Sequence, residues 1–514
     1  MSKTIIIIGA GLAGLSAALQ AAENGCNVKL VSSLPSERAQ SVMAEGGINA
    51  ALNTKDENDS PEEHFTDTIK AACGLADPNA VWGMTQAAPE LVHWLLKLGV
   101  KFNMSGYDDV DLRNFGGQKK KRTAFAQSDT GKQIMTAMID AVRRKEAFGM
   151  VERFSHHSFL TLRLCGNICC GCVIRDEYSQ ETVELPGDAV IVATGGMHGL
   201  FGNTTGSLSN TGEVTAELFR LGVPLANGEM IQYHPTTVKC GGKRMLISEA
   251  ARGEGGRLFA MKDGKQWYFM EEKYPELGNL MPRDITAREI WKVSHESEVF
   301  LDMTEISEEI ISNKLSGLAD DCMTYLHKDI RKEPVSVLPG IHYFMGGILV
   351  DEQHRTPIQN LYAAGECCAQ YHGANRLGGN SLLGALYGGR VAAKSACEQA
   401  DVVDLSCATQ IDFPPASQIS EIKQLNKVMQ ETMGVVRNEN TLLNGIQTVQ
   451  ALTGNLPLLG MAVLKSALAR KESRGAHWRE DYPKSNDDDY LKTTVARFDR
   501  KQIQISFVPV PERR

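Results

Sequence analysis

A glycine-rich loop near the start of the chain has the spacing of a site for dinucleotide phosphates. Gly9, Gly11 and Gly14 follow a β-branched run and open an alanine-rich stretch. Gly9 suits a tight turn, Gly11 lets the backbone approach a pyrophosphate, and Gly14 allows a helix and a strand to pack closely. The free N–H groups of the helix N-terminus then attract the phosphate charge. We therefore predict a dinucleotide at Gly9, Ala10, Gly11, Leu12, Ala13 and Gly14.

Such a loop must be held by a strand before it, a helix after it and a second parallel strand. Thr4–Ile8 predicts a buried strand, a helix follows to about Glu23, and Asn27–Val31 predicts the second strand. An acidic residue commonly ends that second strand and holds a ribose, but Ser32 and Ser33 stand there instead. The loop by itself therefore leaves NAD and FAD as open alternatives.

Two later segments favour FAD. Residues 188–196 read DAVIVATGG and residues 360–366 read NLYAAGE, so each predicts a buried strand that ends in glycine. Both resemble the strands that carry the adenosine and ribityl parts of FAD in two-dinucleotide-type flavoproteins. Together with the first loop they predict FAD, with Thr194, Gly195 and Glu366 near it.

Length and composition describe an ordinary globular protein. A chain of 514 residues suggests about three domains. The net charge of −8 argues against general binding to nucleic acid, which needs a basic surface. No stretch has the length of a membrane span, and Thr4–Ala22 has only Lys3 as a basic flank, unlike a signal peptide. We expect a cytoplasmic protein without a direct membrane span.

Four of the twelve cysteines lie within eight residues, at Cys165, Cys169, Cys170 and Cys172. They could form a metal or iron–sulfur site. The surrounding stretch, however, alternates like a β-hairpin around Gly166, so neighbouring cysteines should point to opposite faces. The hairpin is the favoured interpretation, and we predict no metal site.

Seven further motifs follow one another along nearly the whole chain, and they resemble one family: the flavoprotein subunits of succinate dehydrogenase and fumarate reductase, which also includes L-aspartate oxidase. They are Ala44–Ala50, Gln232–Thr236, Ser248–Gly256, Pro282–Asp284, His342–Gly347, His372–Leu382 and Glu472–His477. The resemblance implies an α/β fold with a Rossmann-like FAD domain, an inserted α+β capping domain and a C-terminal helical region.

The resemblance also implies hydride transfer between FAD and fumarate or succinate. Hydride addition to fumarate builds negative charge, which fixed cations and strong donors stabilise. The family positions that grip the two carboxylates correspond here to His234, Ser248, His342 and Arg376. Arg283 is predicted to be the proton donor, with Glu249 and Arg252 as its relay. Because arginine has a pKa above about 12, the alternative is that Arg283 only clamps a carboxylate.

The FAD contacts implied by the resemblance spread over much of the chain. They are Ser32, Ser33, Ser41, Ala44, Glu45, Gly46, Gly47, Glu213, Glu366, Arg376, Ser381 and Leu382. Many members tether FAD covalently through a histidine just before Ala44, but Gln40 holds that position here. We therefore predict non-covalent FAD. Since the tether raises the flavin potential, its loss favours fumarate reduction over succinate oxidation.

Two alternatives to this enzyme are open. Non-covalent FAD is also typical of L-aspartate oxidase, although the run from Arg376 to Ser381 resembles the dehydrogenase and reductase side. A flavin-binding electron carrier without turnover is the other alternative. The presence of Arg283, His234, His342 and Arg376 argues against it.

The expected architecture is a discontinuous FAD domain at residues 1–224 and 345–400, a capping domain at 225–344, and a C-terminal helical domain with a polar tail at 401–514. Closure of the capping domain would exclude water from the site. The resemblance implies an iron–sulfur subunit as partner and, through partner subunits, a membrane anchor at the inner face of the cell membrane. A free-standing enzyme is the alternative.

Overall fold

The computed structural model describes residues 2–106, 109–401, 411, 413 and 418–514. Its central element is a parallel sheet with the strand order β20-β10-β1-β2-β6. The strands are β1 (Thr4–Ile8), β2 (Asn27–Ser32), β6 (Val151–Ser155), β10 (Ala189–Val192) and β20 (Leu361–Ala363). The three predicted buried strands thus lie side by side, and their carboxyl ends meet at one edge.

Strand β1 packs against a different layer on each face. Ile5 and Ile7 contact a helical layer, whereas Ile6 and Ile8 contact a second, antiparallel sheet. The helices are α1 (Leu12–Glu23), α3 (Pro78–Lys97), α4 (Thr130–Ala147) and α11 (Asn380–Gln399). The antiparallel strands are β7 (His157–Cys165), β8 (Ile168–Asp176) and β9 (Thr182–Pro186). A run of four isoleucines suits a strand that is buried on both faces.

The cysteine-rich segment is a β-hairpin, as predicted. Cys165 pairs with Ile168 across the turn that contains Gly166. Cys169 and Cys172 lie in the apolar core between the two sheets. In the described part of the chain, no group of three or more histidine, cysteine or acidic side chains is placed to hold a metal ion.

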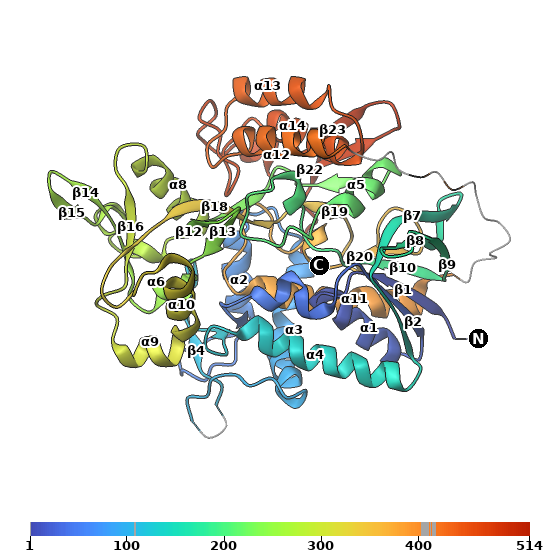
Figure 1. Cartoon of the computed structure of the whole chain (residues 1–514), viewed down its shortest axis with the longest axis horizontal. Coiled ribbons are helices and arrows are strands. Elements are labelled where there is room, and N and C mark those ends of the chain that lie inside the picture. The colour runs from blue at the N-terminus through green and yellow to red at the C-terminus, as the bar shows by residue number, and fades with distance from the viewer. Residues whose placement is uncertain (1, 107–108, 402–410, 412, 414–417) are drawn as a thin grey trace.

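A second body, which we call the cap, lies at the opposite end of the long axis from the parallel sheet (Figure 1). One of its sheets has the order β13-β12-β18 and the other β15-β14-β16-β17. The strands are β12 (Ile231–Cys240), β13 (Lys243–Leu246), β14 (Arg257–Lys262), β15 (Lys265–Trp267), β16 (Val299–Asp302), β17 (Val335–Ser336) and β18 (Leu338–Phe344). The helices are α6 (Glu249–Gly253), α7 (Phe269–Lys273), α8 (Arg283–Val293), α9 (Glu308–Lys314) and α10 (Ser316–Asp321), followed by a π-helical turn at Cys322–Leu326.

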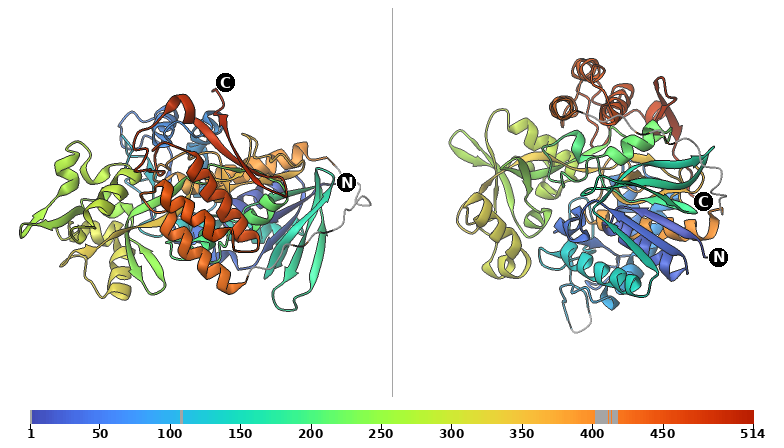
Figure 2. Two further views of the ribbon diagram at one scale, coloured as in Figure 1. Left: turned by 90° about the horizontal axis from the view of Figure 1, so that it is seen from above. Right: turned by 45° about the vertical axis from the view of Figure 1, so that its right-hand side comes forward.

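The C-terminal region forms the helices that the sequence predicts, and also a hairpin that it does not. The helices are α12 (Ile419–Thr432), α13 (Glu439–Val449) and α14 (Asn455–Ala469). They lie together along one side of the molecule (Figure 2). The expected polar tail instead contains β22 (Lys492–Phe498) and β23 (Ile503–Pro509). β22 pairs with β11 (Leu225–Ala226), which also pairs with β19 (Gly347–Leu349).

That hairpin is only partly buried. Every residue of β23 is partly or fully exposed, and only Thr494, Val495 and Ala496 of β22 are buried. In β23, Ile503, Ile505 and Phe507 alternate with polar residues, which is the pattern of a half-buried strand. The predicted division into three domains stays a prediction. Among the described residues, no helix is both long and apolar enough to cross a bilayer.

The remaining short elements connect these layers and line the space between them. They are β3 (Ile48–Asn49), β4 (Leu112–Arg113), β5 (Thr123–Ala124), β21 (Cys368–Ala369), α2 (Pro61–Ala71), α5 (Glu213–Arg220) and α15 (Asp487–Tyr490). Helix α5 and a turn at His198–Leu200 pack against the C-terminal helices in one apolar cluster. The loop between that turn and α5 forms one wall of the site.

Candidate active site

A cavity of about 670 Å³ extends from the end of β1 to the cap, and it gathers nearly all of the predicted site residues. Those that line it are Gly9, Ala10, Gly11, Leu12, Ala13, Ser32, Ser33, Ser41, Ala44, Glu45, Gly46, Gly47, Thr194, Gly195, Glu213, His234, Ser248, Glu249, Arg283, His342, Glu366, Arg376, Ser381 and Leu382. Gly14 and Arg252 lie behind its wall. Residues predicted from distant segments thus share one cavity.

The end of the cavity at β1 is built mainly from backbone. Gly9 has φ of +111°, and a Cβ there would lie 2.3 Å from the carbonyl oxygen of Ala193. A Cβ on Gly14 would lie 1.8 Å from the carbonyl oxygen of Gly9, so the helix can approach the strand only because residue 14 is glycine. A Cβ on Gly11 would meet nothing closer than 3.7 Å. No backbone atom crowds that position, so the backbone of Gly11 can lie close to a bound pyrophosphate.

The groups around this end fit a dinucleotide. Gly11 precedes the first residue of α1, Leu12 and Ala13 of that helix line the cavity, and Leu12 N donates to Ser41 Oγ at 3.3 Å. Ser32 Oγ is buried at the end of β2 and has no hydrogen-bond partner among the described residues. A ribose hydroxyl would satisfy that group, since buried polar atoms without partners are rare. The residues at this end therefore fit FAD.

Glu366 lines the cavity just beyond the end of β20. Its Oε1 accepts a hydrogen bond from Phe344 N at 3.0 Å, which links the FAD-side loop to the end of β18. Burial raises the pKa of Glu366 to about 7. This carboxyl group can therefore accept or share a proton near neutral pH.

The cap end of the cavity is built from charged and polar side chains. His234 on β12 and His342 on β18 lie on paired strands, and their ring centroids are 5.1 Å apart. Ser248 is the N-cap of α6, and Arg283 is the first residue of α8. Arg376 comes from the loop before α11 on the opposite side. The cap and the FAD side therefore both contribute cationic or hydrogen-bond-donating side chains to this end of the cavity.

A continuous chain of ion pairs runs from Arg283 away from the cavity. Its Nε and Nη2 donate to Glu249 Oε2 at 2.9 and 2.6 Å. Arg252 Nη2 donates to Glu249 Oε1 at 3.3 Å. Burial pushes the pKa of Glu249 up, but the charges of Arg283 and Arg252 outweigh it and the pKa is lowered. Glu249 is thus an ionised link between two arginines.

Gln232 is a residue of the site to which the sequence analysis gave no role. Its Oε1 accepts from Arg283 Nη1 at 3.0 Å and from Arg376 Nη2 at 2.9 Å, and it is fully buried. It therefore joins the two arginines that come from opposite sides of the cavity. The available signal was its spacing: Gln232 and His234 are two apart on one strand, so their side chains share a face.

Both histidines of the site are neutral. Burial, with the nearby charge of Arg283, holds the pKa of His234 and of His342 well below the usual value. Burial and the charge of Arg283 also lower the pKa of Arg376, to about 9, so it stays protonated at neutral pH. Two cationic arginines beside two neutral imidazoles make a positively charged space. A small dianion is the ligand that this arrangement favours.

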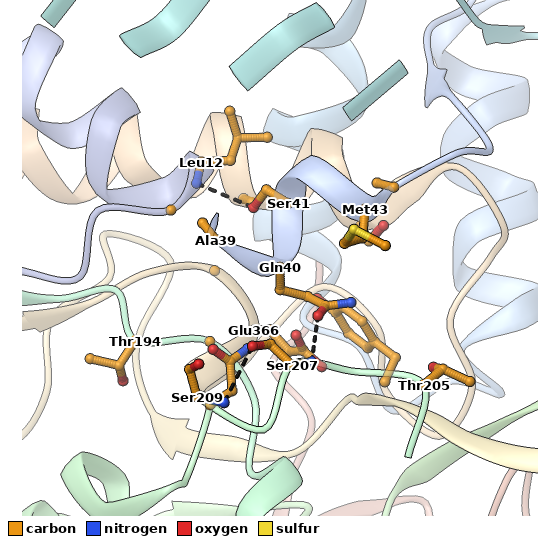
Figure 3. A pocket seen from close by; sticks show the side chains of 18 of the residues that line it. Leu12, Ala39, Gln40, Ser41, Met43, Thr194, Thr205, Ser207, Ser209 and Glu366 are labelled. Carbon is orange, nitrogen blue, oxygen red and sulfur yellow. Dashed lines mark hydrogen bonds between the residues drawn. The ribbon is translucent and has the colours of Figure 1, made fainter. Parts of the chain in front are cut away.

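Gln40 is the residue that the sequence analysis assigned to the position of the covalent tether. It lines the cavity, and its Oε1 accepts a hydrogen bond from Ser207 N at 2.5 Å (Figure 3). Figure 3 also shows Thr205 and Ser209 on the same loop as Ser207, facing the short helix that carries Gln40 and Met43. The Gln40 side chain thus connects this loop to the short helix.

The chain matches two family models and a consistent set of known proteins. Residues 4–382 match the model described as FAD binding domain, and residues 452–513 match fumarate reductase flavoprotein C-term. The chain is 39% identical to a succinate dehydrogenase flavoprotein subunit from Bacillus subtilis, over 96% of this chain and 94% of that protein. It is 33% identical to the 8-methylmenaquinol:fumarate reductase flavoprotein subunit of Wolinella succinogenes, over 97% and 89%. A solved chain of E. coli quinol fumarate reductase superposes with a TM-score of 0.90 at 28% identity, over 99% and 97%.

Proposed function

Since the chain belongs to the family of succinate dehydrogenase and fumarate reductase flavoprotein subunits, we propose that it transfers a hydride between FAD and fumarate or succinate and works mainly as a fumarate reductase. The observation that carries this proposal is the pair of arginines, Arg283 and Arg376, that meet at Gln232 beside two neutral histidines. Fumarate carries two carboxylates, and this space holds donors enough for both.

In this proposal the Gly9–Gly14 loop and Glu366 would hold FAD, which would supply the hydride when bound. Arg376, His234, His342 and Ser248 bind the two carboxylates and orient the double bond. Fixed donors at these positions stabilise the negative charge that builds on the carboxylate-bearing fragment, because they need no reorganisation as the charge develops. The cap residues keep water out of this space.

Arg283 then donates a proton to the carbon next to the one that receives the hydride. Its guanidinium is held on three sides by Glu249 and Gln232, which fixes the direction of the remaining N–H bonds. Glu249 and Arg252 lead away from the cavity and return a proton to Arg283. An arginine acid is plausible here because the acceptor is a strongly basic carbanion.

We further propose that FAD is held without a covalent bond, with Gln40 in the position of the usual tether. The proposed partner is an iron–sulfur subunit, because the relatives named above are subunits of dehydrogenases and reductases. Through such a partner the protein would attach at the periphery of a membrane. This chain would thus carry out the hydride and proton transfer, and the partner subunit would supply the electrons.

The first experiment tests how FAD is held. The purified yellow protein is denatured with acid and the polypeptide is precipitated. Release of all yellow colour into the supernatant is the expected result. Colour that stays with the polypeptide would show a covalent bond and overturn the role given to Gln40.

The second experiment tests the reaction and its direction. Turnover of fumarate with reduced viologen is compared with oxidation of succinate by an artificial acceptor and with oxidation of L-aspartate by oxygen. We expect fumarate reduction to be the fastest of the three. Faster aspartate oxidation would instead support an L-aspartate oxidase-like enzyme, and absence of all three would support a flavin carrier without turnover.

A further inference from the structure

One hydrogen bond of the site comes from a residue outside every motif used above. Thr205 lies in the loop between the turn at His198–Leu200 and α5, and it lines the cavity. Its Oγ1 lies 2.8 Å from Nδ1 of His342. The hydroxyl group of Thr205 therefore contacts Nδ1 of His342 and not the other ring nitrogen, Nε2.

The loop is fixed to the strand that carries His342. Thr205 N donates to the carbonyl oxygen of Ile341 at 3.0 Å, so this loop is bound one residue before the histidine. Gln40 and Arg244 bind the same loop on either side, through Ser207 N and Thr204 O. The position of the Thr205 hydroxyl is thus set by the backbone and not by the side chain alone.

The hydroxyl has one proton and two acceptors within reach. The carbonyl oxygen of Ile341 is 3.3 Å away, whereas Nδ1 of His342 is 2.8 Å away. Since Ile341 O already accepts from Thr205 N, it is not left unsatisfied when the hydroxyl turns to the imidazole. The shorter contact and the satisfied carbonyl both favour donation from Thr205 to Nδ1.

Whether the Thr205 hydroxyl donates to Nδ1 matters because of the protonation state of His342. Burial and the charges of Arg283 and Arg376 hold the pKa of His342 well below its usual value, so the ring is neutral and carries one N–H. Its Nε2 makes no hydrogen bond to any residue that the structure describes, and the ring lines the cavity. A neutral histidine can donate from one nitrogen only, and the partner of the other nitrogen decides which.

We propose that Thr205 is a positioning residue that fixes the tautomer of His342, placing the single proton on Nε2 so that it is donated to a substrate carboxylate. The proposal rests on the proposed function for the identity of the substrate. With the proton on Nδ1 instead, a lone pair would face the carboxylate and repel it. Thr205 acts through His342 and needs no contact with substrate.

Two substitutions of Thr205 test this proposal, and they differ in whether the hydroxyl group is kept. Thr205→Val removes the hydroxyl and keeps the shape of the side chain, whereas Thr205→Ser keeps the hydroxyl. Thr215→Val is the matched control, because Thr215 is buried on α5 and its hydroxyl has no partner among the described residues. Rates of fumarate reduction by reduced viologen are expressed per bound flavin, so that any loss of cofactor is corrected.

We expect Thr205→Val to lower kcat/KM for fumarate by about tenfold to hundredfold, mostly through KM, since a hydrogen bond to a charged group is lost. Thr205→Ser and Thr215→Val should stay within about twofold of the wild type. Equal losses in the valine and serine variants would overturn the proposal, because they would show a requirement for shape. An unchanged valine variant would overturn it as well.

A second measurement is independent of turnover. In protein labelled with ¹⁵N-histidine, the ring signals of His342 are assigned by their loss in His342→Gln. We expect Nε2 to be the protonated nitrogen in the wild type and in Thr205→Ser, and a shift toward Nδ1 protonation in Thr205→Val. A wild-type ring protonated on Nδ1 overturns the inference. If fumarate is not turned over at all, the proposed function fails while this spectrum still decides the tautomer.

Discussion

The two ends of the cavity use different parts of the chain to bind their ligands. At the β1 end, the glycines of the loop after β1 bring the backbone close to the cavity, and small side chains from other segments, such as Ser32, Ser41 and Thr194, also line it. At the cap end, contacts come from the side chains of several elements far apart in sequence. The first end should therefore be sensitive to any added carbon, and the second to any changed functional group.

The largest effect should follow from a change of functional group at the cap end. Arg283→Gln removes the proposed acid, and we expect kcat for fumarate to fall by about 10² to 10⁴. The check is steady-state reduction of fumarate by reduced viologen, per bound flavin. If Arg283 is only a clamp for a carboxylate, KM will rise while kcat is largely kept.

Arg288→Gln is the control for this variant. Arg288 lies on the same helix, α8, with its guanidinium carbon 4.0 Å from the ring centroid of Trp478, outside the cavity. Its substitution should leave both constants within about twofold. A loss equal to that of Arg283→Gln would show that the helix, and not the acid, is what matters.

Added carbons at the β1 end should give the next largest effects, and the site of the carbon should decide their kind. Gly14→Ala places a Cβ 1.8 Å from Gly9 O and should destabilise the fold by about 1–3 kcal/mol or more. In Gly11→Ala the added Cβ would make ordinary van der Waals contacts with Ser41 and Ala39, at 3.7 and 3.8 Å, so its Tm without added FAD should stay near the wild type. Its affinity for FAD should nevertheless fall by about tenfold or more, because the pyrophosphate is kept away.

The measurements are thermal unfolding and titration of the protein with FAD. Gly242→Ala is a control, since a Cβ there meets nothing within 4 Å and the residue is outside the cavity. Wild-type affinity for FAD in Gly11→Ala would contradict the assignment of this loop to the phosphates.

The same contrast explains what could be predicted from the sequence. The β1 end is local, so the strand, the glycine loop and the helix could be derived from the residues themselves, and the structure confirms all three. The cysteine hairpin is local too, and it is confirmed. The cap end is not local, because no spacing along the chain brings His234, His342 and Arg376 together. Those residues were found through resemblance alone.

Contacts that depend on folding, without a motif, could not be predicted. Gln232 matters because two arginines from opposite sides converge on its carbonyl oxygen, and Thr205 because its loop is bound to β18. The spacing of Gln232 and His234 places their side chains on one face, but nothing in the sequence indicates that two arginines converge there or that the loop of Thr205 is bound to β18. The hairpin of β22 and β23 is a different case, because a local signal was present and was missed: Ile503, Ile505 and Phe507 alternate with polar residues, as in a half-buried strand.

A smaller effect at the cap end is expected from Ser248→Ala. Ser248 lines the cavity and also caps α6, accepting from Ala250 N at 3.4 Å. Loss of one neutral donor to a carboxylate should raise KM for fumarate by about threefold to tenfold and change kcat less. Ser294→Ala is the control, because Ser294 Oγ donates to Trp291 O at the end of α8, outside the cavity. Equal effects in the two variants would show that Ser248 acts only through helix stability.

The smallest effect should come from Glu45, which lies where the two ends meet. Burial, followed by the charges of Asp321 in the cap and Asp129 beside α4, raises the pKa of Glu45 from 4.5 to about 8. An acid with a raised pKa in the folded state stabilises the fold below its unfolded pKa, and this contribution is lost as the pH rises toward the folded pKa. The wild type should therefore lose stability between about pH 4.5 and pH 8.

Glu45→Gln has no proton to lose, so the difference between the two proteins should grow with pH. We expect its Tm to match the wild type within about 1 °C at pH 5 and to exceed it by roughly 3–6 °C at pH 9, since a protein of this size shifts by about 2–4 °C or less per kcal/mol. Thermal unfolding of the flavoprotein at several pH values is the check, with the exposed Glu305→Gln as control. A difference that is constant with pH would mean that Glu45 is already ionised in the fold. Glu45 would then be a charged group, stabilised by Arg113, between the cap and the FAD side. The neighbouring acids Asp321 and Asp129 argue against this, because their charges raise the pKa of Glu45.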